Sequence, residues 1–121
     1  MKIKEMYYYS QAIKLLIDNF YELKEIYDDD EDYYIDLPYI FYESEFVPFI
    51  EKEIKENNIN KLSSIFNFIE DLYINGDEKL KNLIGVSVIE ALCLGPDFNY
   101  NMVHPYIGEV TKKEFDRMLN R

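Results

Sequence analysis

Residues 60–94 read NKLSSIFNFIEDLYINGDEKLKNLIGVSVIEALCL, two apolar patterns separated by the turn sequence Asn75-Gly76-Asp77. In the first pattern, apolar residues recur every three or four positions, as on one face of an α-helix: Leu62, Ile65, Phe66, Ile69, Leu72 and Tyr73. Asn60 can cap the start of this helix, Asn75-Gly76 can end it, and Asp77 can cap the next one. Because so short a loop forces its two helices to run antiparallel, the stretch predicts a helical hairpin.

The second helix of this hairpin is predicted to be the most buried element of the chain. A helix that is apolar nearly all round is typical of the centre of a helical protein. Gly95-Pro96 can end it, and Gly85 lies inside it, where glycine costs about 1 kcal/mol relative to alanine. We interpret Gly85 as allowing a neighbouring helix to approach closely. The apolar residues of this helix are Leu80, Leu83, Ile84, Val86, Val88, Ile89, Leu92 and Cys93.

Upstream of the hairpin, residues 6–27 carry one apolar stripe and predict a single helix. This helix should end at the acidic run of residues 28–32, because adjacent carboxylates repel one another and are unfavourable at a helix C-terminus. Asp36 and Pro38 then predict a new helix start, with Asp36 as the cap. The aromatic and β-branched residues of 33–42 also allow a short strand.

Two further helices complete the pattern. Residues 45–58 read EFVPFIEKEIKENN, in which Pro48 is tolerable only near a first turn. The last helix is predicted to begin at Thr111, which with Glu114 has the spacing of a capping box. The chain is therefore predicted to be all-α, with five to six helices in antiparallel hairpins, packed in a compact HEAT-like bundle that forms a single domain over residues 1–121.

Composition narrows the class of protein. Hydrophobic residues make up 48% of the 121 residues, which excludes disorder over most of the length. No stretch approaches the roughly 20 apolar residues that cross a bilayer, and the first residues lack the pattern of a signal peptide. The single cysteine, Cys93, cannot form an internal disulfide, so we expect a cytoplasmic protein.

The negative charge is concentrated in one third of the chain. The formal net charge is -11, and residues 18–56 contain 14 acids and three lysines, whereas acids and bases balance in the remainder. Such a field repels nucleic acid and anionic membranes and attracts a basic protein. Acidity that only maintains solubility is the alternative interpretation.

Catalytic and cofactor motifs are missing from the sequence. His104 and Cys93 are the only histidine and cysteine, and a dyad between them would have to reach a thiol on an apolar helix face. No register of the acidic run fits an EF-hand loop, one histidine and one cysteine cannot make a zinc site, and no glycine-rich phosphate loop is present. We therefore expect neither an enzyme nor a bound cofactor or metal, although weak association of calcium or magnesium with residues 28–32 stays open.

What the sequence offers in place of catalysis is a set of carboxylates interleaved with tyrosines. Tyrosine is enriched at binding hot spots, and carboxylates pair with the lysines and arginines of a partner. In a chain with twelve tyrosines several must also belong to the core. The predicted partner-binding residues are Asp28, Asp29, Asp30, Glu31, Asp32, Tyr33, Tyr34, Asp36, Tyr39, Tyr42, Glu43 and Glu45.

Residues 37–94, with LPYIFYESEFVPFIEKEI followed by IFNFIEDLYINGDEKLKNLIGVSVIEAL, resemble small bacterial immunity proteins encoded beside contact-dependent or other polymorphic toxins. The resemblance implies a cytoplasmic protein that binds one cognate toxin domain, in many cases a basic nuclease, and covers its active site or substrate groove. Two alternatives remain: a helical adaptor or scaffold that binds a peptide or basic protein, and a DNA-mimic inhibitor. None of these roles involves direct contact with nucleic acid or a membrane.

Overall fold

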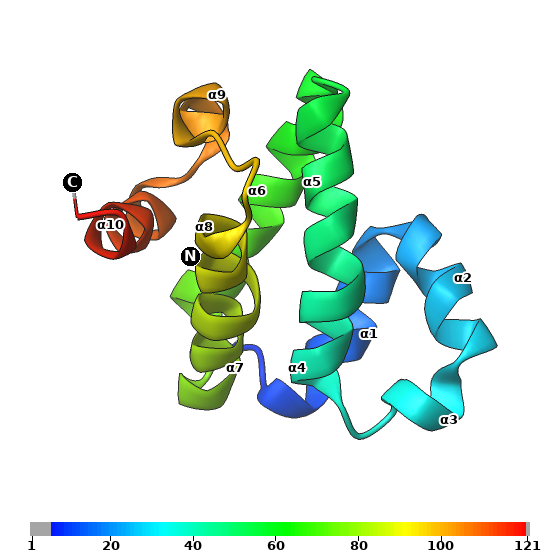
Figure 1. The fold of residues 1–121 in the computed structure, drawn as a ribbon. Coiled ribbons are helices and arrows are strands. Elements are labelled where there is room, and N and C mark those ends of the chain that lie inside the picture. The colour runs from blue at the N-terminus through cyan, green and yellow to red at the C-terminus, as the bar shows by residue number, and fades with distance from the viewer. Residues whose placement is uncertain (1–5, 121) are drawn as a thin grey trace, which may run out of the picture.

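The computed structural model describes residues 6–120, and within them the chain is helical without a β-strand (Figure 1). The α-helices are α1 (Ala12–Asn19), α2 (Tyr21–Asp29), α3 (Glu31–Tyr34), α4 (Pro38–Phe41), α5 (Val47–Lys55), α6 (Ile59–Asn75), α7 (Glu78–Leu83), α8 (Ala91–Leu94), α9 (Tyr100–Val103) and α10 (Glu109–Met118). Two π-helical stretches, Tyr42–Phe46 and Ile84–Glu90, join α4 to α5 and α7 to α8. Short 3₁₀ turns precede α1 (Tyr9–Gln11) and follow α9 (His104–Tyr106).

The all-α class is confirmed, but the count of five to six helices is not, because residues 6–120 form eight continuous helical segments. One extra segment arises at Phe20, where the predicted single helix over residues 6–27 is broken. Phe20 is extended (φ −133°, ψ 98°), and its ring packs against the rings of Phe46, Phe49 and Phe68 at 5.4–5.7 Å. Burial of this aromatic ring outweighs the local helical pattern.

The acidic run accounts for another segment. Helix α2 ends at Asp29 within the run, as predicted, and Asp30 is non-helical. The chain then starts α3 with Glu31 and Asp32 in its first turn, where negative charge is favourable. The run thus contains both a helix end and a helix start.

The segment of residues 38–55 is one long helix rather than two. Pro38 lies in its first turn, as predicted, and is its first residue, so Leu37 stands at the cap position instead of Asp36. The strand alternative for residues 33–42 is wrong. Pro48 lies well inside this helix. Because a proline clashes with the carbonyl four residues earlier, the adjacent π-helical stretch (Tyr42–Phe46), whose widened turn relieves that contact, explains why the helix continues.

The hairpin of α6 and α7 forms as predicted, although Asn58 rather than Asn60 caps α6. Helix α6 ends at Asn75 before Gly76, and the Asp77 carboxylate accepts the Leu80 N–H at 2.9 Å. The other carboxylate oxygen of Asp77 accepts the Tyr9 N–H at 3.1 Å, and this hydrogen bond holds the N-terminal segment against the turn. In Figure 1 the helix of residues 38–55 and α10 flank this hairpin, an arrangement that does not support HEAT-like stacking of repeated hairpins.

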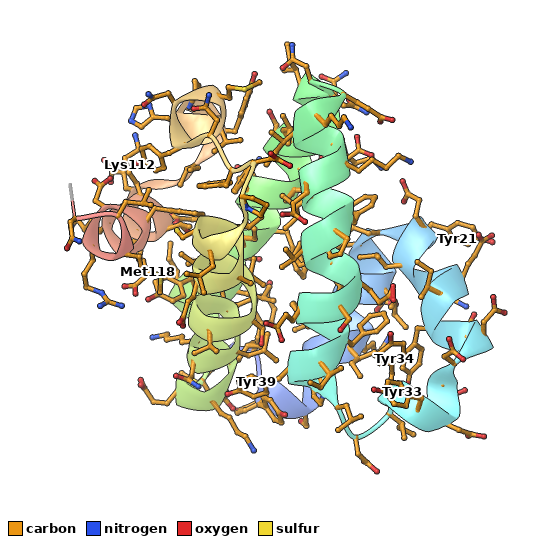
Figure 2. All side chains as sticks on the ribbon, viewed as in Figure 1. Tyr21, Tyr33, Tyr34, Tyr39, Lys112 and Met118 are labelled. Atoms are coloured by element: carbon orange, nitrogen blue, oxygen red, sulfur yellow. The ribbon has the colours of Figure 1, made fainter. Side chains whose placement is uncertain are left out.

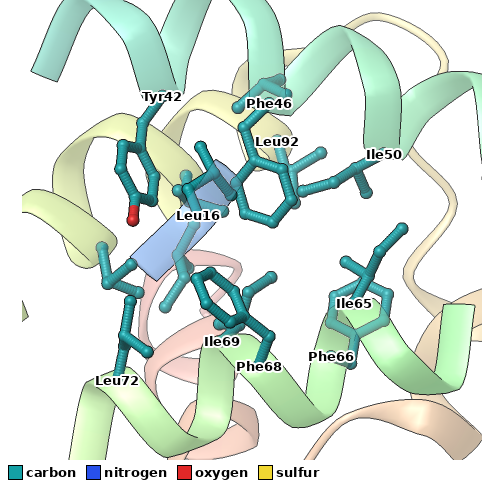
Figure 3. Packing of buried hydrophobic residues seen from close by; sticks show 14 of the residues in the cluster. Leu16, Tyr42, Phe46, Ile50, Ile65, Phe66, Phe68, Ile69, Leu72 and Leu92 are labelled. Atoms are coloured by element: carbon teal, nitrogen blue, oxygen red, sulfur yellow. The ribbon is translucent and has the colours of Figure 1, made fainter. Parts of the chain in front are cut away.

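The core lies between α1, the helix of residues 38–55 and the hairpin (Figure 3). The second helix of the hairpin is the buried centre, as predicted, and all of its large aliphatic residues except Val86 and the terminal Leu94 are fully buried. Gly85 does not serve close packing, since a Cβ placed there would meet nothing within 4 Å. None of the helices within residues 6–120 is long and apolar enough to cross a membrane.

Helix α10 is capped from a distant part of the chain. The Glu70 carboxylate on α6 accepts hydrogen bonds from the backbone N–H groups of Val110 (3.1 Å) and Thr111 (2.8 Å) and from the Thr111 hydroxyl (2.6 Å). The predicted capping box of Thr111 and Glu114 is therefore wrong: α10 begins at Glu109, and Glu114 is paired with Arg117. A carboxylate at a helix N-terminus satisfies unpaired donors and favours the helix dipole.

Candidate functional site

Residues 21–37, which we name the acidic arm, comprise α2, α3 and the turn into α4. The arm contains eight acids and one lysine. That lysine, Lys24, is bound to Asp28 at 2.6 Å. The carboxylates of Asp29, Asp30, Glu31, Asp32 and Asp36 are exposed, and the structure gives them no ion pair within the described residues 6–120. The arm lies on the opposite side of the molecule from α10 (Figure 1).

Apolar side chains fix the arm to the body. Leu23, in α2, is buried, and the Tyr34 ring in α3 lies edge-on to the Phe41 ring at 4.8 Å. The Tyr34 hydroxyl donates to Glu45 at 3.1 Å. Burial and this hydrogen bond raise the pKa of Tyr34 to about 12. The arm is therefore presented as a fixed surface of the fold, with its carboxylates directed to solvent.

The predicted site tyrosines divide into two groups (Figures 2 and 3). Tyr33 projects outward with 60% of its surface exposed, and Tyr39 is half-buried, accepting a hydrogen bond from the Asn82 amide at 2.9 Å. Tyr34 is 7% exposed and Tyr42 is completely buried, with its hydroxyl donating to the Ala12 carbonyl at 2.6 Å. Tyr34 and Tyr42 therefore belong to the core, and their assignment to a partner surface is corrected.

The two predicted glutamates on the long helix also differ. Glu43 is exposed, whereas Glu45 is half-buried and accepts the Tyr34 hydroxyl hydrogen bond. Glu45 thus holds α3 in place, and only Glu43 extends the exposed acidic surface beyond the arm.

Exposed apolar residues of the arm were missed by the sequence analysis. The stripe predicted over residues 6–27 can include either Ile26 or Tyr27, and Ile26 is 37% exposed; Tyr21 is 68% exposed (Figure 2). Ile35 and Leu37 are 55% and 37% exposed. The only signal in the sequence was their position directly beside the carboxylates. They give the arm apolar contact area as well as charge.

One of these residues borders a groove. A groove of about 480 Å³ runs between α1 and the turn from α3 to α4, with Ile13 and Ile17 on one wall and Tyr27, Ile35 and Asp36 on the other. The pKa of Tyr27 is raised by partial burial and then by the neighbouring carboxylates of Glu31, Asp28 and Asp36. The groove therefore opens into the field of the acidic arm.

The remaining chemistry-bearing residues do not assemble into a catalytic group. Cys93 is half-buried, and burial followed by the charge of Glu90 raises the pKa of its thiol, which disfavours the reactive thiolate. His104 is exposed and lies edge-on to the Tyr100 ring at 5.5 Å, with no hydrogen bond to Cys93. Among residues 6–120, no three His, Cys, Asp or Glu side chains are placed so that they could hold a metal ion.

Comparison with known proteins places the chain in a family. No curated protein and no solved structure matches it significantly. The profile of DUF7674, described as a domain of unknown function, matches residues 13–121, which include the whole acidic arm and the helical hairpin. Because the match spans nearly the entire chain, the protein belongs to the DUF7674 family.

Proposed function

We propose that this chain is an immunity protein, a cytoplasmic inhibitor that binds a cognate toxin domain with a basic surface, in the first instance a nuclease. The observation that carries the proposal is the set of exposed, unpaired carboxylates on the acidic arm. Carboxylates in such an arrangement attract lysines and arginines and accelerate association at low salt. On a nuclease they would occupy the positions of substrate phosphates and so cover the substrate groove.

The arm suits this role because its core contacts are separate from its charges. Leu23 and Tyr34 hold it on the body, and the carboxylates of residues 29–32 are left to face a partner. A partner that binds them does not have to break an ion pair, because among residues 6–120 the ion pairs of the arm involve Asp28 with Lys24 and Glu22 with Lys61. Recognition therefore needs neither a cofactor nor a catalytic residue of this chain.

The first test uses the reading frame directly upstream of this one. Its C-terminal domain is expressed with and without the present chain, and growth and complex formation are measured. We expect growth arrest that this chain relieves, together with a one-to-one or other fixed-stoichiometry complex. A neighbouring product that neither arrests growth nor binds would refute the immunity role.

A second test asks whether the arm makes the contact. The double reversal Asp30→Lys/Asp32→Lys is compared with Glu90→Lys/Asp97→Lys, which changes exposed acids outside the arm by the same net charge. We expect the arm variant to slow association about tenfold at low salt and to weaken its salt dependence, and the control to have a much smaller effect. Equal effects of the two variants would show that net charge, and not the arm, steers binding.

The groove beside the arm favours one other function, a helical adaptor that binds basic peptide segments from several proteins. Such an adaptor would bind several unrelated basic ligands with similar weak affinities. An immunity protein would bind one toxin domain far more tightly, so a comparison of dissociation constants separates the two functions.

A further inference from the structure

The groove between α1 and the α3–α4 turn has mainly apolar walls and lies beside carboxylates of the acidic arm. Ile13 and Ile17 are half-buried, and Ile35, on the opposite wall, keeps 55% of its surface exposed. The volume of about 480 Å³ is within the range of sites that enclose a large side chain or a small ligand. Burial of exposed apolar area of this kind by a partner stabilises the complex.

The carboxylates around the groove favour a partner segment of positive charge. Asp36 and Lys14 line it, and the carboxylates of Glu31 and Asp28 lie near Tyr27, which forms part of its wall. Asp28 is itself paired with Lys24. The two lysines beside the groove, Lys14 and Lys79, each contact another side chain of the fold. Lys14 pairs with Asp18 at 2.7 Å, and the Lys79 ammonium lies over the Tyr9 ring at 4.2 Å.

We propose that this groove receives one apolar side chain from a cationic segment of the partner, while Glu31 and Asp36 bind the lysines or arginines on either side of it. The inference rests on the proposed function in that the cationic partner is the toxin domain. An apolar anchor in a pocket with charges at its rim is the arrangement that concentrates binding energy at protein interfaces. The carboxylates would steer encounter, and the anchor would slow dissociation.

A larger groove elsewhere in the described residues provides an internal comparison. It has a volume of about 680 Å³ and lies between α5 and the loop before α9, with Ile54, Phe98 and Met102 in its lining. Lys52 and Lys55 stand at its edge. It is apolar and larger, but Glu51 and Asp97 in its lining balance the two lysines, so it lacks the excess of carboxylates found beside the first groove.

The test uses three synthetic nine-residue peptides with the full chain, and isoleucine and methionine methyl signals are followed by NMR. The first peptide contains four lysines, glycines and a central leucine; the second has glycine in place of the leucine; the third has glutamates in place of the lysines. We expect the first peptide to shift the methyl signals of Ile13, Ile17 and Ile35 and to bind about tenfold more tightly than the second. The third should produce no shift.

Two variants of matched exposure locate the site. Ile35→Ser removes one wall of the groove, and Ile59→Ser makes the same change at a residue that is 53% exposed and lies outside it. We expect Ile35→Ser to abolish the advantage of the leucine peptide over the glycine peptide and Ile59→Ser to leave it intact. Because both side chains are exposed, circular dichroism should show both variants folded.

Several outcomes overturn the proposal: equal binding of the leucine and glycine peptides, shifts at Met102 in place of Ile35, or no shift at millimolar peptide. Failure of this inference is distinguishable from failure of the proposed function. If the toxin domain binds Ile35→Ser as tightly as the natural chain, the groove is not the anchor site although the immunity role stands. If the leucine peptide occupies the groove but no neighbouring toxin exists, the groove stands and the immunity role fails.

Discussion

Glu70 on α6 and Thr111 on α10 are 41 residues apart in the chain, yet one carboxylate oxygen of Glu70 accepts both the backbone N–H and the hydroxyl of Thr111, at 2.8 and 2.6 Å. Thr111 is fully buried, so water cannot replace these bonds. The second carboxylate oxygen of Glu70 accepts the Val110 N–H at 3.1 Å. A single side chain therefore supplies the N-terminal cap of the last helix and holds that helix on the hairpin.

Removal of this cap should destabilise the protein. For Glu70→Ala we expect the free energy of unfolding to fall by about 1–3 kcal/mol, because two backbone donors and a buried hydroxyl lose their acceptor. Glu70→Gln keeps one acceptor oxygen and should cost less. Urea denaturation monitored by circular dichroism measures both, and a loss for alanine no larger than that for the exposed control Glu90→Gln would contradict the capping role.

The Glu70 carboxylate should leave room only for glycine at position 108. A Cβ there would lie 2.3 Å from Glu70 Cδ, so Gly108→Ala must displace a side chain held by three hydrogen bonds. We expect a loss of about 1–2 kcal/mol that nearly disappears in the Glu70→Ala background. Gly85→Ala is the matched control, since its Cβ would meet nothing within 4 Å, and it should leave stability unchanged or raise it by up to about 1 kcal/mol. Additive losses for Gly108→Ala and Glu70→Ala would show that the two residues are independent.

The hydroxyl of Tyr42 should contribute to the core. Tyr42→Phe removes the buried bond to the Ala12 carbonyl (2.6 Å) without changing the ring, and we expect a loss of about 1 kcal/mol in thermal or urea unfolding. Tyr33→Phe, at a side chain that is 60% exposed, should change stability by less than about 0.5 kcal/mol. If the two substitutions had the same effect, the buried hydroxyl would contribute nothing.

Tyr34 makes stability depend on pH in the alkaline range. Its pKa is raised from 10.0 to about 12 in the folded protein, so the folded state binds the phenolic proton more tightly than the unfolded chain does. The resulting stabilisation is complete below pH 10 and is lost as the pH rises through 12. Tyr34→Phe has no proton to lose at this position. The advantage of the natural chain over Tyr34→Phe should therefore shrink between pH 10 and 12 in urea melts, and a constant difference across this range would contradict the assignment.

The carboxylates of the acidic arm should matter for binding but not for folding. Asp30 and Asp32 are exposed and lack ion pairs among residues 6–120, and they repel their acidic neighbours. Asp30→Asn/Asp32→Asn should therefore leave the free energy of unfolding within about 0.5 kcal/mol, because relief of this repulsion offsets the loss of a favourable charge in the first turn of α3. A clear loss of stability in this variant would assign these residues a structural role and weaken the case for a partner surface.

The sequence by itself determined the features that depend on neighbouring residues. The period of the apolar residues predicts the hairpin of α6 and α7, Asn75-Gly76 ends its first helix, and Asp77 begins its second. Pro38 starts the long helix because its ring suits a first turn. These signals act within a few residues, through backbone dihedral angles and capping hydrogen bonds.

The concentration of acids was likewise visible in the sequence, because net charge is a property of the chain that folding does not change. Which aromatic residues accompany those acids on the surface was not. Tyr33 and Tyr34 are adjacent and identical, yet one is exposed and the other lies against Phe41. No local pattern separates them, because the difference depends on where α3 meets the long helix.

Only the tertiary structure decided the break at Phe20, the cap from Glu70 and the groove beside Ile35. Each depends on groups far apart in the chain: Phe20 is extended so that its ring reaches Phe68, and Glu70 reaches Thr111 across the fold. The physical reason is that packing and desolvation energies arise between elements that become neighbours only in the folded state. They can outweigh local helix propensity, which rarely exceeds about 1 kcal/mol per residue.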